Sequence, residues 1–139
     1  MNLPYRQPNF WSKGLRLAWG DPDLLSKSDA LRYQWPSIGT GWEEGLLAFT
    51  RSRITSTQSY NGGEIQLLSD VLRLPNISVI IAAGTKDNAI HWKNARRIAD
   101  HFNDTGKVVL VEFCGRGHNP FEENSLEFVQ KIQEAITTA

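Results

Sequence analysis

The segment Ile77-Ser78-Val79-Ile80-Ile81-Ala82-Ala83 determines the fold class of this chain. Apart from Ser78 it is a continuous apolar run, which is typical of a strand that is buried on both faces of a parallel sheet. A second strand-forming run follows at Val108–Phe113, and the residues between the two runs place apolar side chains at helical spacing. A strand, a crossover helix and a second strand predict parallel pairing with a right-handed connection.

Three helices are expected around these two strands. Residues 64–73 form the first, which Pro75 ends because proline cannot continue a helix. Residues 92–102 form the crossover helix. Asn124, with Glu127 three residues later, is a capping signature for the last helix, whose buried stripe is Val129, Ile132 and Ile136. The predicted order is therefore α-β-α-β-α, an α/β fold with parallel strands.

The N-terminal part, residues 1–60, is rich in tryptophan, proline and glycine and has no alternating pattern, so it predicts short helices joined by turns. Ser28 or Asp29 is expected to cap one of them. That helix ends near Trp35, because Pro36 disfavours helical geometry in the residue before it. The last helix of this part begins at Trp42 and is predicted to be amphipathic, with an apolar face of Leu46, Leu47, Phe49 and Ile54.

A domain boundary is predicted between residues 1–60 and residues 61–139, because the polar segment before it ends in the flexible sequence Asn61-Gly62-Gly63. Two parallel strands do not complete a core, since a parallel sheet is normally covered on both faces and extended by further strands. A long apolar strand edge is then left open, and such edges invite pairing with another chain. The sequence therefore predicts a part of something larger.

Charge and composition exclude several classes of partner. The 15 basic and 15 acidic residues cancel and are scattered, so neither nucleic acid nor an anionic membrane surface is expected to bind. The longest apolar run, Val79–Ala83, is far shorter than the roughly 20 residues of a membrane-spanning helix. The first residues lack the basic and hydrophobic regions of a secretory signal, and the single cysteine, Cys114, suits a reducing compartment. An intracellular location is expected.

Two residues are predicted to form a catalytic pair. In an open parallel sheet the ligand site lies beyond the carboxyl ends of the strands. Asp87 follows the first strand and His118 follows the second, so adjacent strands bring both side chains to the same rim. A carboxylate that accepts the imidazole Nδ1–H fixes the tautomer and stabilises the imidazolium that forms when Nε2 takes a proton. Asp87 is therefore the expected acid and His118 the expected general base.

Each of these residues also has a structural alternative. Asp87 occupies a position where aspartate commonly caps a following helix. His118 lies in a turn, where its side chain could simply form a hydrogen bond with the backbone. His91 falls at the start of the crossover helix and His101 on its later, partly polar turn, where solvent or packing roles are the default. Cys114 is expected to be a small buried hydrophobe. No spacing typical of metal ligands is present, so neither a metal nor a cofactor is expected.

The two motifs resemble segments of a known superfamily. Leu74–Ile81 followed by Gly84-Thr85-Lys86-Asp87 resembles the strand-and-acid segment of α/β-hydrolases. Gly117-His118-Asn119-Pro120-Phe121-Glu122-Glu123 is similar to their catalytic-histidine segment, and acid before histidine agrees with the family order serine, acid, histidine. Asp29–Tyr33 and Gly41–Phe49 resemble the helical lid of plant and algal members. The resemblance implies a lid over residues 1–60, the C-terminal part of the core over 61–139, and the cytoplasm or a plastid as the compartment.

The family's nucleophile is missing from this sequence. The nucleophile elbow, G-x-S-x-G on a strand-to-helix turn, occurs nowhere in the chain, and the early strands and the oxyanion-hole loop are missing as well. Ser37 and Ser59 lack small residues on both sides. By family order these parts would lie upstream of Met1. The resemblance thus implies a partial α/β-hydrolase fold that supplies Asp87 and His118 but no serine, and that is inactive alone.

The parent reaction implied by the resemblance is hydrolysis of an ester-like bond in a small apolar substrate. Trp92, close after the acid, and Trp42 and Phe49 in the lid are the expected substrate contacts. One alternative is a fragment or degenerate hydrolase without catalysis, acting as a ligand-binding or sheet-completing module. Another is an unrelated small α/β domain that dimerises through its open edge.

Overall fold

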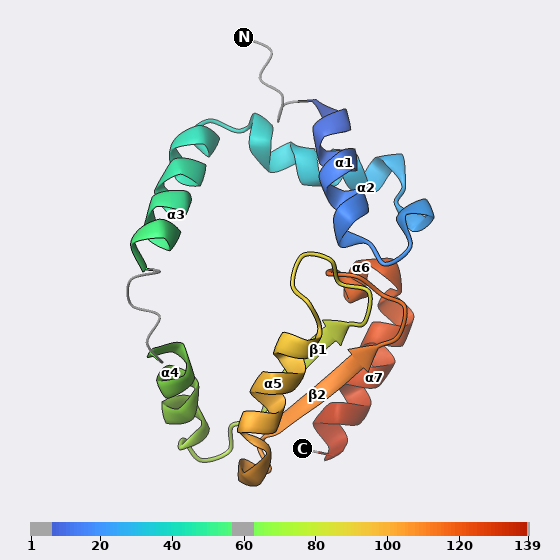
Figure 1. Cartoon of the computed structure of the whole chain (residues 1–139). Coiled ribbons are helices and arrows are strands. Elements are labelled where there is room, and N and C mark those ends of the chain that lie inside the picture. Colours follow the sequence, from blue (N-terminus) through green and yellow to red (C-terminus); the bar gives the residue numbers. More distant parts are fainter. Residues whose placement is uncertain (1–6, 57–62, 139) are drawn as a thin grey trace.

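The computed structural model describes residues 7–56 and 63–138 and has a mixed α/β fold (Figure 1). The helices and strands in chain order are α1 (Pro8–Ala18), α2 (Lys27–Gln34), α3 (Trp42–Ser56), α4 (Gly63–Leu72), β1 (Val79–Gly84), α5 (Lys93–His101), β2 (Val108–Phe113), α6 (Pro120–Glu123) and α7 (Ser125–Thr138). Short 3-10 helices lie at η2 (Pro22–Leu24), η3 (Trp35–Ile38) and η5 (Asn103–Thr105). The predicted order α-β-α-β-α is confirmed by α4, β1, α5, β2 and α7.

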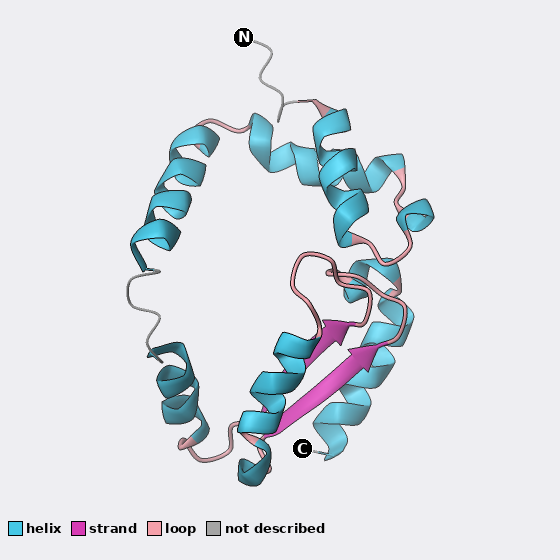
Figure 2. Ribbon diagram, viewed as in Figure 1, coloured by secondary structure: helices cyan, strands magenta, loops and turns pink. Residues whose placement is uncertain are grey.

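The two strands pair in parallel, from Val79 opposite Val108 to Gly84 opposite Phe113. Both strands therefore end at the same rim, from which the two loops leave (Figure 2). The first strand begins two residues later than predicted, because Asn76 adopts a left-handed conformation with φ 60° and the chain turns there. Parallel pairing of β1 and β2, predicted from the order strand, helix, strand, is confirmed.

Helices α5 and α7 lie on opposite faces of this small sheet (Figure 1). On the α7 face, Phe113 is fully buried and stacks on Phe128 with ring centroids 5.2 Å apart. The side chains that complete this cluster are Ile80, Val109, Val111, Ile132 and Ala135. On the other face, Glu112 forms an ion pair with Arg96 of α5. The alternation along β2 thus directs successive side chains to different helices.

The expectation that the first strand is buried on both faces is wrong. Ala82 is exposed and Ile80 and Ile81 are half-buried, whereas Ala83 and Gly84 at the rim are buried. Within the described ranges the sheet has two strands, so each strand keeps one unpaired edge. An apolar strand with one neighbour leaves part of its surface to solvent, and the predicted open edge is therefore present.

The N-terminal helices form a second cluster. Helix α1, which was not predicted, packs Leu15 and the following Trp19 against Ala30 of α2. The cap of α2 was assigned wrongly, because Ser26, not Ser28 or Asp29, is its N-cap. Ser26 Oγ accepts the Asp29 N–H at 3.1 Å, and Asp29 Oδ2 accepts the Ser26 N–H at 3.0 Å. This reciprocal capping box makes Asp29 the third helical residue rather than the cap.

Helix α3 begins at Trp42 as predicted, but three of the four side chains expected on its buried face are exposed, namely Leu46, Leu47 and Phe49. The side chain of the fourth, Ile54, lies outside the described part of the structure. Figure 1 shows α3 and α4 on the side of the molecule away from β2 and α7. Of the predicted flexible joint, Asn61 and Gly62 lie outside the described residues, and Gly63 begins α4. No helix within residues 7–56 and 63–138 combines the length and hydropathy needed to cross a membrane.

Candidate active site

Asp87 and His118 meet at the rim where the two strands end. Nδ1 of the imidazole lies 2.9 Å from Oδ2 of the carboxylate. The Asp87 side chain is 10% exposed, whereas that of His118 is 39% exposed. The carboxylate is therefore sheltered and the imidazole accessible, which is the arrangement in which a histidine can exchange protons with a bound molecule. The juxtaposition predicted from the strand order is thus found.

The second oxygen of Asp87 organises its own loop. Oδ1 accepts the backbone N–H groups of Ala89 and Ile90, each at 2.8 Å. The carboxylate therefore does not cap α5, whose N-cap is Trp92; one of its oxygens stabilises the turn before that helix and the other meets the histidine. Hydrogen bonds to both oxygens fix the orientation of the Asp87 carboxylate plane, and with it the direction in which Oδ2 faces the His118 imidazole.

The loop that carries His118 is held by its backbone. The His118 N–H donates to the carbonyl of Ala18 at 2.6 Å, while its side chain is engaged with Asp87. Gly115, with φ 75°, donates its N–H to Thr85 Oγ1 at 2.8 Å, and the Lys86 N–H donates to the carbonyl of Arg116 at 2.8 Å. The acid loop and the histidine loop are therefore tied to each other by one main-chain hydrogen bond and by one that the Thr85 hydroxyl accepts.

Three glycines allow the backbone segments at this rim to touch. A Cβ atom on Gly84 would lie 2.0 Å from the carbonyl oxygen of Gly117, and one on Gly117 would lie 2.1 Å from that of Ala18. A Cβ on Gly20 would lie 2.3 Å from the carbonyl oxygen of Gly115. These distances are far below van der Waals contact, so the end of α1, the end of β1 and the histidine loop approach each other only as glycine backbones.

A small cavity of about 140 Å³ opens beside the pair. Asp87 and His118 line it together with Trp92 and Ile90, which make its walls partly apolar, and with Ala82, Ala83, Gly84, His91 and Ala95. Trp92, an expected substrate contact, thus lies at the pair. His91, for which a solvent or packing role was predicted, also lines the cavity, and its Nδ1 accepts the Lys93 N–H at 3.2 Å.

The other two expected substrate contacts lie elsewhere. Trp42 and Phe49 line a different hollow of about 530 Å³ between η3 and the first turns of α3. That hollow shares no lining residue with the cavity at His118. Within the described part of the chain, the indole N–H of Trp42 is buried without a hydrogen-bond partner. The structure therefore groups Trp92 with the acid–histidine pair and does not bring Trp42 and Phe49 to it.

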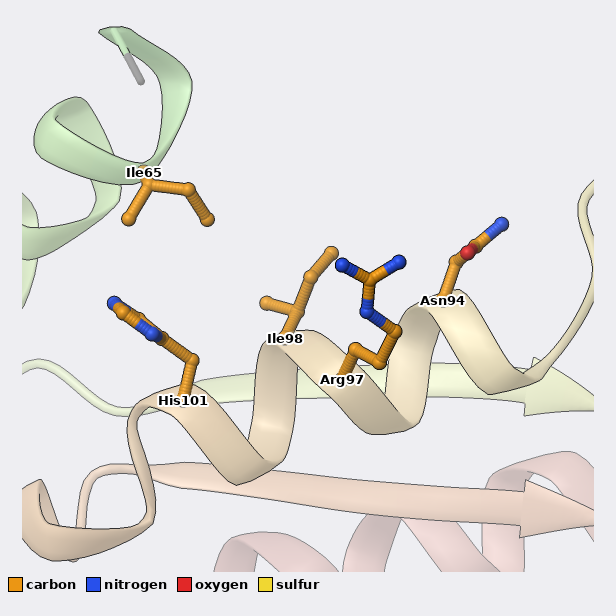
Figure 3. A pocket seen from close by; sticks show the side chains of 5 residues that line it. All are labelled: Ile65, Asn94, Arg97, Ile98 and His101. Atoms are coloured by element: carbon orange, nitrogen blue, oxygen red, sulfur yellow. The ribbon is translucent and has the colours of Figure 1, made fainter. Parts of the chain in front are cut away.

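A third hollow, of about 330 Å³, lies between α4 and α5 (Figure 3). Figure 3 shows the side chains of Arg97, Ile98 and His101 rising from α5 toward Ile65 of α4. These side chains stand on the side of α5 that faces away from the strands (Figure 3). His101 is therefore separated from the acid–histidine pair, in agreement with the peripheral role predicted for it.

Several contacts around the histidine loop were not predicted. The Asn119 amide donates to the hydroxyl of Tyr33 at 3.0 Å, and burial together with the nearby Glu122 carboxylate raises the pKa of Tyr33 above its ordinary value. Behind the loop, Arg116 donates to Glu127 at 3.1 Å. Partial burial pushes the pKa of Glu127 upward, but the hydrogen bonds from Arg116 and from Lys131 of the same helix outweigh it and hold the pKa below its ordinary value. Sequence spacing alone cannot predict contacts between residues that belong to different elements of the chain.

Among the described residues, those that line the cavity at His118 include no serine, threonine or cysteine. Ser37 is fully buried in η3, where its hydroxyl donates to the Gln34 carbonyl at 2.5 Å and accepts from the Trp11 indole at 3.3 Å. Ser59 lies outside the described residues. Cys114 is exposed rather than buried, because Phe113 directs its side chain into the core and the chain turns immediately after it. The described residues hold no group of three or more metal-ligating side chains.

Comparison of the chain with protein-family models, with curated proteins and with solved structures finds no match. A sheltered carboxylate, a histidine with an accessible ring and a partly apolar cavity form an arrangement in which a proton can be held and transferred beside a small bound molecule.

Proposed function

We propose that this chain supplies the acid and the general base of a serine-type acyl hydrolase, as the lid and the C-terminal part of an α/β-hydrolase core. The contact between Asp87 Oδ2 and His118 Nδ1, at 2.9 Å beyond the carboxyl ends of two parallel strands, carries the proposal. A carboxylate in that place keeps the proton on Nδ1 and leaves the lone pair on Nε2. Nε2 is the atom that a serine hydroxyl would need.

The chemistry follows from that tautomer. His118 takes the proton of a serine hydroxyl, and the serine oxygen attacks the carbonyl carbon of an ester. The imidazolium, stabilised by Asp87, returns the proton to the leaving alcohol, and an acyl-enzyme forms. Water then attacks the acyl group with the same imidazole as base. The serine itself must come from outside these 139 residues, either on the same polypeptide or on a partner.

Small acyl groups are the favoured substrates. The walls that Trp92 and Ile90 contribute are apolar, and a volume of about 140 Å³ holds only a few carbon atoms beside the pair. Apolar walls with a few convergent polar groups are typical of small-molecule sites. We place the parent reaction in the cytoplasm or a plastid, as the resemblance of the N-terminal helices to plant and algal lids implies.

A second candidate function is a non-catalytic module that completes the sheet of another chain. The observation in its favour is the two-stranded sheet itself, whose strand β1 has an apolar, half-exposed edge region at Ile80–Ala82. An unpaired apolar edge pairs readily with an added strand. This function needs the edge and is indifferent to the imidazole of His118.

Covalent labelling separates the two functions. A fluorophosphonate probe would be applied to the native protein, captured with an antibody raised against residues 61–139. The hydrolase proposal expects an adduct on a serine that lies outside the 139 residues, and expects the variant His118→Ala to lose it. Complete lack of an adduct in the captured assembly would refute the hydrolase and favour the sheet-completing module.

A further inference from the structure

The carboxylate of Glu123 bridges two backbone segments that are distant in the sequence. Oε1 accepts the N–H of Gly117 at 2.6 Å, and Oε2 accepts the N–H of Gly20 at 3.0 Å. Gly117 directly precedes His118, and Gly20 follows the end of α1. Each oxygen thus takes one main-chain donor, one from the histidine loop and one from the N-terminal helices. We propose that Glu123 is a positioning residue, which couples the proposed lid to the acid–histidine pair.

This place needs a side-chain acceptor. Gly117 is buried, and neither glycine offers a side chain that could interlock with the facing segment. Backbone N–H groups removed from water require a partner, and a carboxylate that receives them forms charge-assisted hydrogen bonds. A neighbouring main-chain bond, from the His118 N–H to the Ala18 carbonyl at 2.6 Å, joins the same two segments. The Glu123 carboxylate therefore completes the contact between the histidine loop and the end of α1, which we call the seam, because it accepts two backbone N–H groups that no backbone carbonyl of the described residues pairs with there.

The position of the imidazole depends on this seam. The hydrogen bonds described for the Glu123 carboxylate go to Gly117 and Gly20 and not to the His118 ring or Asp87, so its effect passes through the backbone of Gly117. On the other side of the loop, the Lys86 N–H bonds to the Arg116 carbonyl at 2.8 Å, which ties the histidine loop to the loop of Asp87. A bond of 2.9 Å between Nδ1 and Oδ2 is lost when the loop moves by about 1 Å, because hydrogen bonds weaken steeply with distance.

The adjacent residue provides a matched control. Glu122 also joins the two segments, but its carboxylate pairs with the guanidinium of Arg32 on α2 and not with the backbone N–H groups of Gly20 and Gly117, which Glu123 accepts. Glu122→Gln removes one carboxylate charge from α6, as Glu123→Gln does, and leaves the two glycine N–H bonds in place. The pair of variants thus separates loss of charge from loss of the backbone acceptor.

The first test measures hydrogen–deuterium exchange of the full chain by mass spectrometry, at concentrations low enough to avoid association. A glutamine has one acceptor oxygen, so Glu123→Gln leaves one of the two N–H groups unpaired. Exchange in the peptides that contain Gly20 and Gly117 should rise about tenfold, since loss of one charge-assisted bond is a change of that order. Peptides from β2 serve as the internal reference for intact folding. Unchanged exchange at both glycines would overturn the inference.

The second test reads the imidazole itself. Diethyl pyrocarbonate acylates the free ring nitrogen of a neutral histidine, and His101, which lies apart from the pair, serves as the internal reference. Glu123→Gln should change the rate of His118 modification relative to His101 in the same direction as Asp87→Asn does, whereas Glu122→Gln should match the wild type. A rate for Glu123→Gln identical to that of the wild type would also overturn the inference.

The inference rests on the proposed function only through the role given to His118, and the two fail differently. If Asp87→Asn leaves the reactivity of His118 unchanged, the acid–histidine pair is refuted whatever Glu123 does. If Asp87→Asn changes that reactivity and Glu123→Gln does not, the pair stands and the positioning role is lost. Glu123→Asp keeps both acceptor oxygens on a shorter side chain. Its exchange at Gly20 and Gly117 should therefore lie between that of the wild type and that of Glu123→Gln.

Discussion

Nδ1 of His118 lies 2.9 Å from Oδ2 of Asp87, although the two residues are 31 positions apart in the chain. Their meeting is a product of register, because Gly84 pairs with Phe113 and each residue follows its strand by a short loop. A shift of one residue in that pairing would turn the last side chains of β2 to the opposite face and move the two loops apart. The contact between Asp87 and His118 therefore depends on the register in which β1 pairs with β2.

Two substitutions of Asp87 should separate its two roles. Asp87→Asn can keep an acceptor oxygen toward the N–H groups of Ala89 and Ile90, but its amide cannot accept the Nδ1–H of His118. Asp87→Ala removes both. We expect Asp87→Ala to lower the free energy of unfolding by about 1 kcal/mol more than Asp87→Asn does, measured by urea denaturation. Equal destabilisation by the two substitutions would mean that the turn does not depend on a side-chain acceptor at position 87.

Glycine substitutions should have opposite signs at two positions. Gly117→Ala places a methyl group 2.1 Å from the carbonyl oxygen of Ala18, so the chain must shift, at a cost of about 1–3 kcal/mol or more. Gly14, in the middle of α1, has nothing within 4 Å of its added Cβ. Gly14→Ala should therefore stabilise the protein by about 0.5–1 kcal/mol through helix propensity. Thermal unfolding of the two variants measures both effects.

The cap of α2 gives a prediction about stability and pH. Ser26→Ala should cost about 1 kcal/mol, whereas Ser28→Ala should cost less, because Ser26 is the N-cap. The hydrogen bond from the Ser26 side chain lowers the pKa of Asp29 below its ordinary value of 3.8. The Asp29 carboxylate thus adds stability that is complete above that value and is lost as the pH falls through the lower folded pKa. In Ser26→Ala this acid-dependent loss should shrink, which a series of denaturation curves at acid pH would reveal.

Glu127 should contribute to acid sensitivity behind the histidine loop. Its pKa in the folded protein lies below the ordinary value of 4.5, so its contribution is present above 4.5 and disappears as the pH falls through the lower value. Glu127→Gln should therefore flatten the decline of stability on the acid side. Glu134→Gln, an exposed position on the same helix, is the control and should leave the decline as it is. If Glu134→Gln flattens the decline more than Glu127→Gln does, Glu127 is not a cause of the acid sensitivity.

The open edge predicts association of the isolated chain. Ala82 is exposed on β1, and a lysine there would place a charge on a strand that has none. Ala82→Lys should reduce the oligomeric or aggregated fraction in light scattering, because charged residues on edge strands oppose further pairing. Ala48→Lys on α3 adds the same charge to an exposed helix and should have little effect. If both variants are as associated as the wild type, association does not proceed through β1.

The apolar run at Ile77–Ala83 and the spacing of the crossover helix sufficed to predict the strand order and the meeting of Asp87 with His118. Those features follow from local periodicity and from the geometry of parallel strands. Burial of β1 could not be predicted, since it depends on how many strands lie beside it. The hydrogen bond between Glu123 and Gly20 could not be predicted either, because Gly20 is 103 residues away in the chain and contributes only a backbone N–H. Side-chain patterns carry no information about such a donor.

The crossing of glycine backbones at the rim has a consequence for recognising distant relatives. At Gly20, Gly84 and Gly117 any other amino acid would place an atom inside a neighbouring carbonyl group. A relative that keeps the crossing must keep these glycines while the helices around them diverge freely. Its signature would be three glycines, with an acid three residues after the second and a histidine directly after the third, a pattern sparse enough to survive where overall similarity has faded.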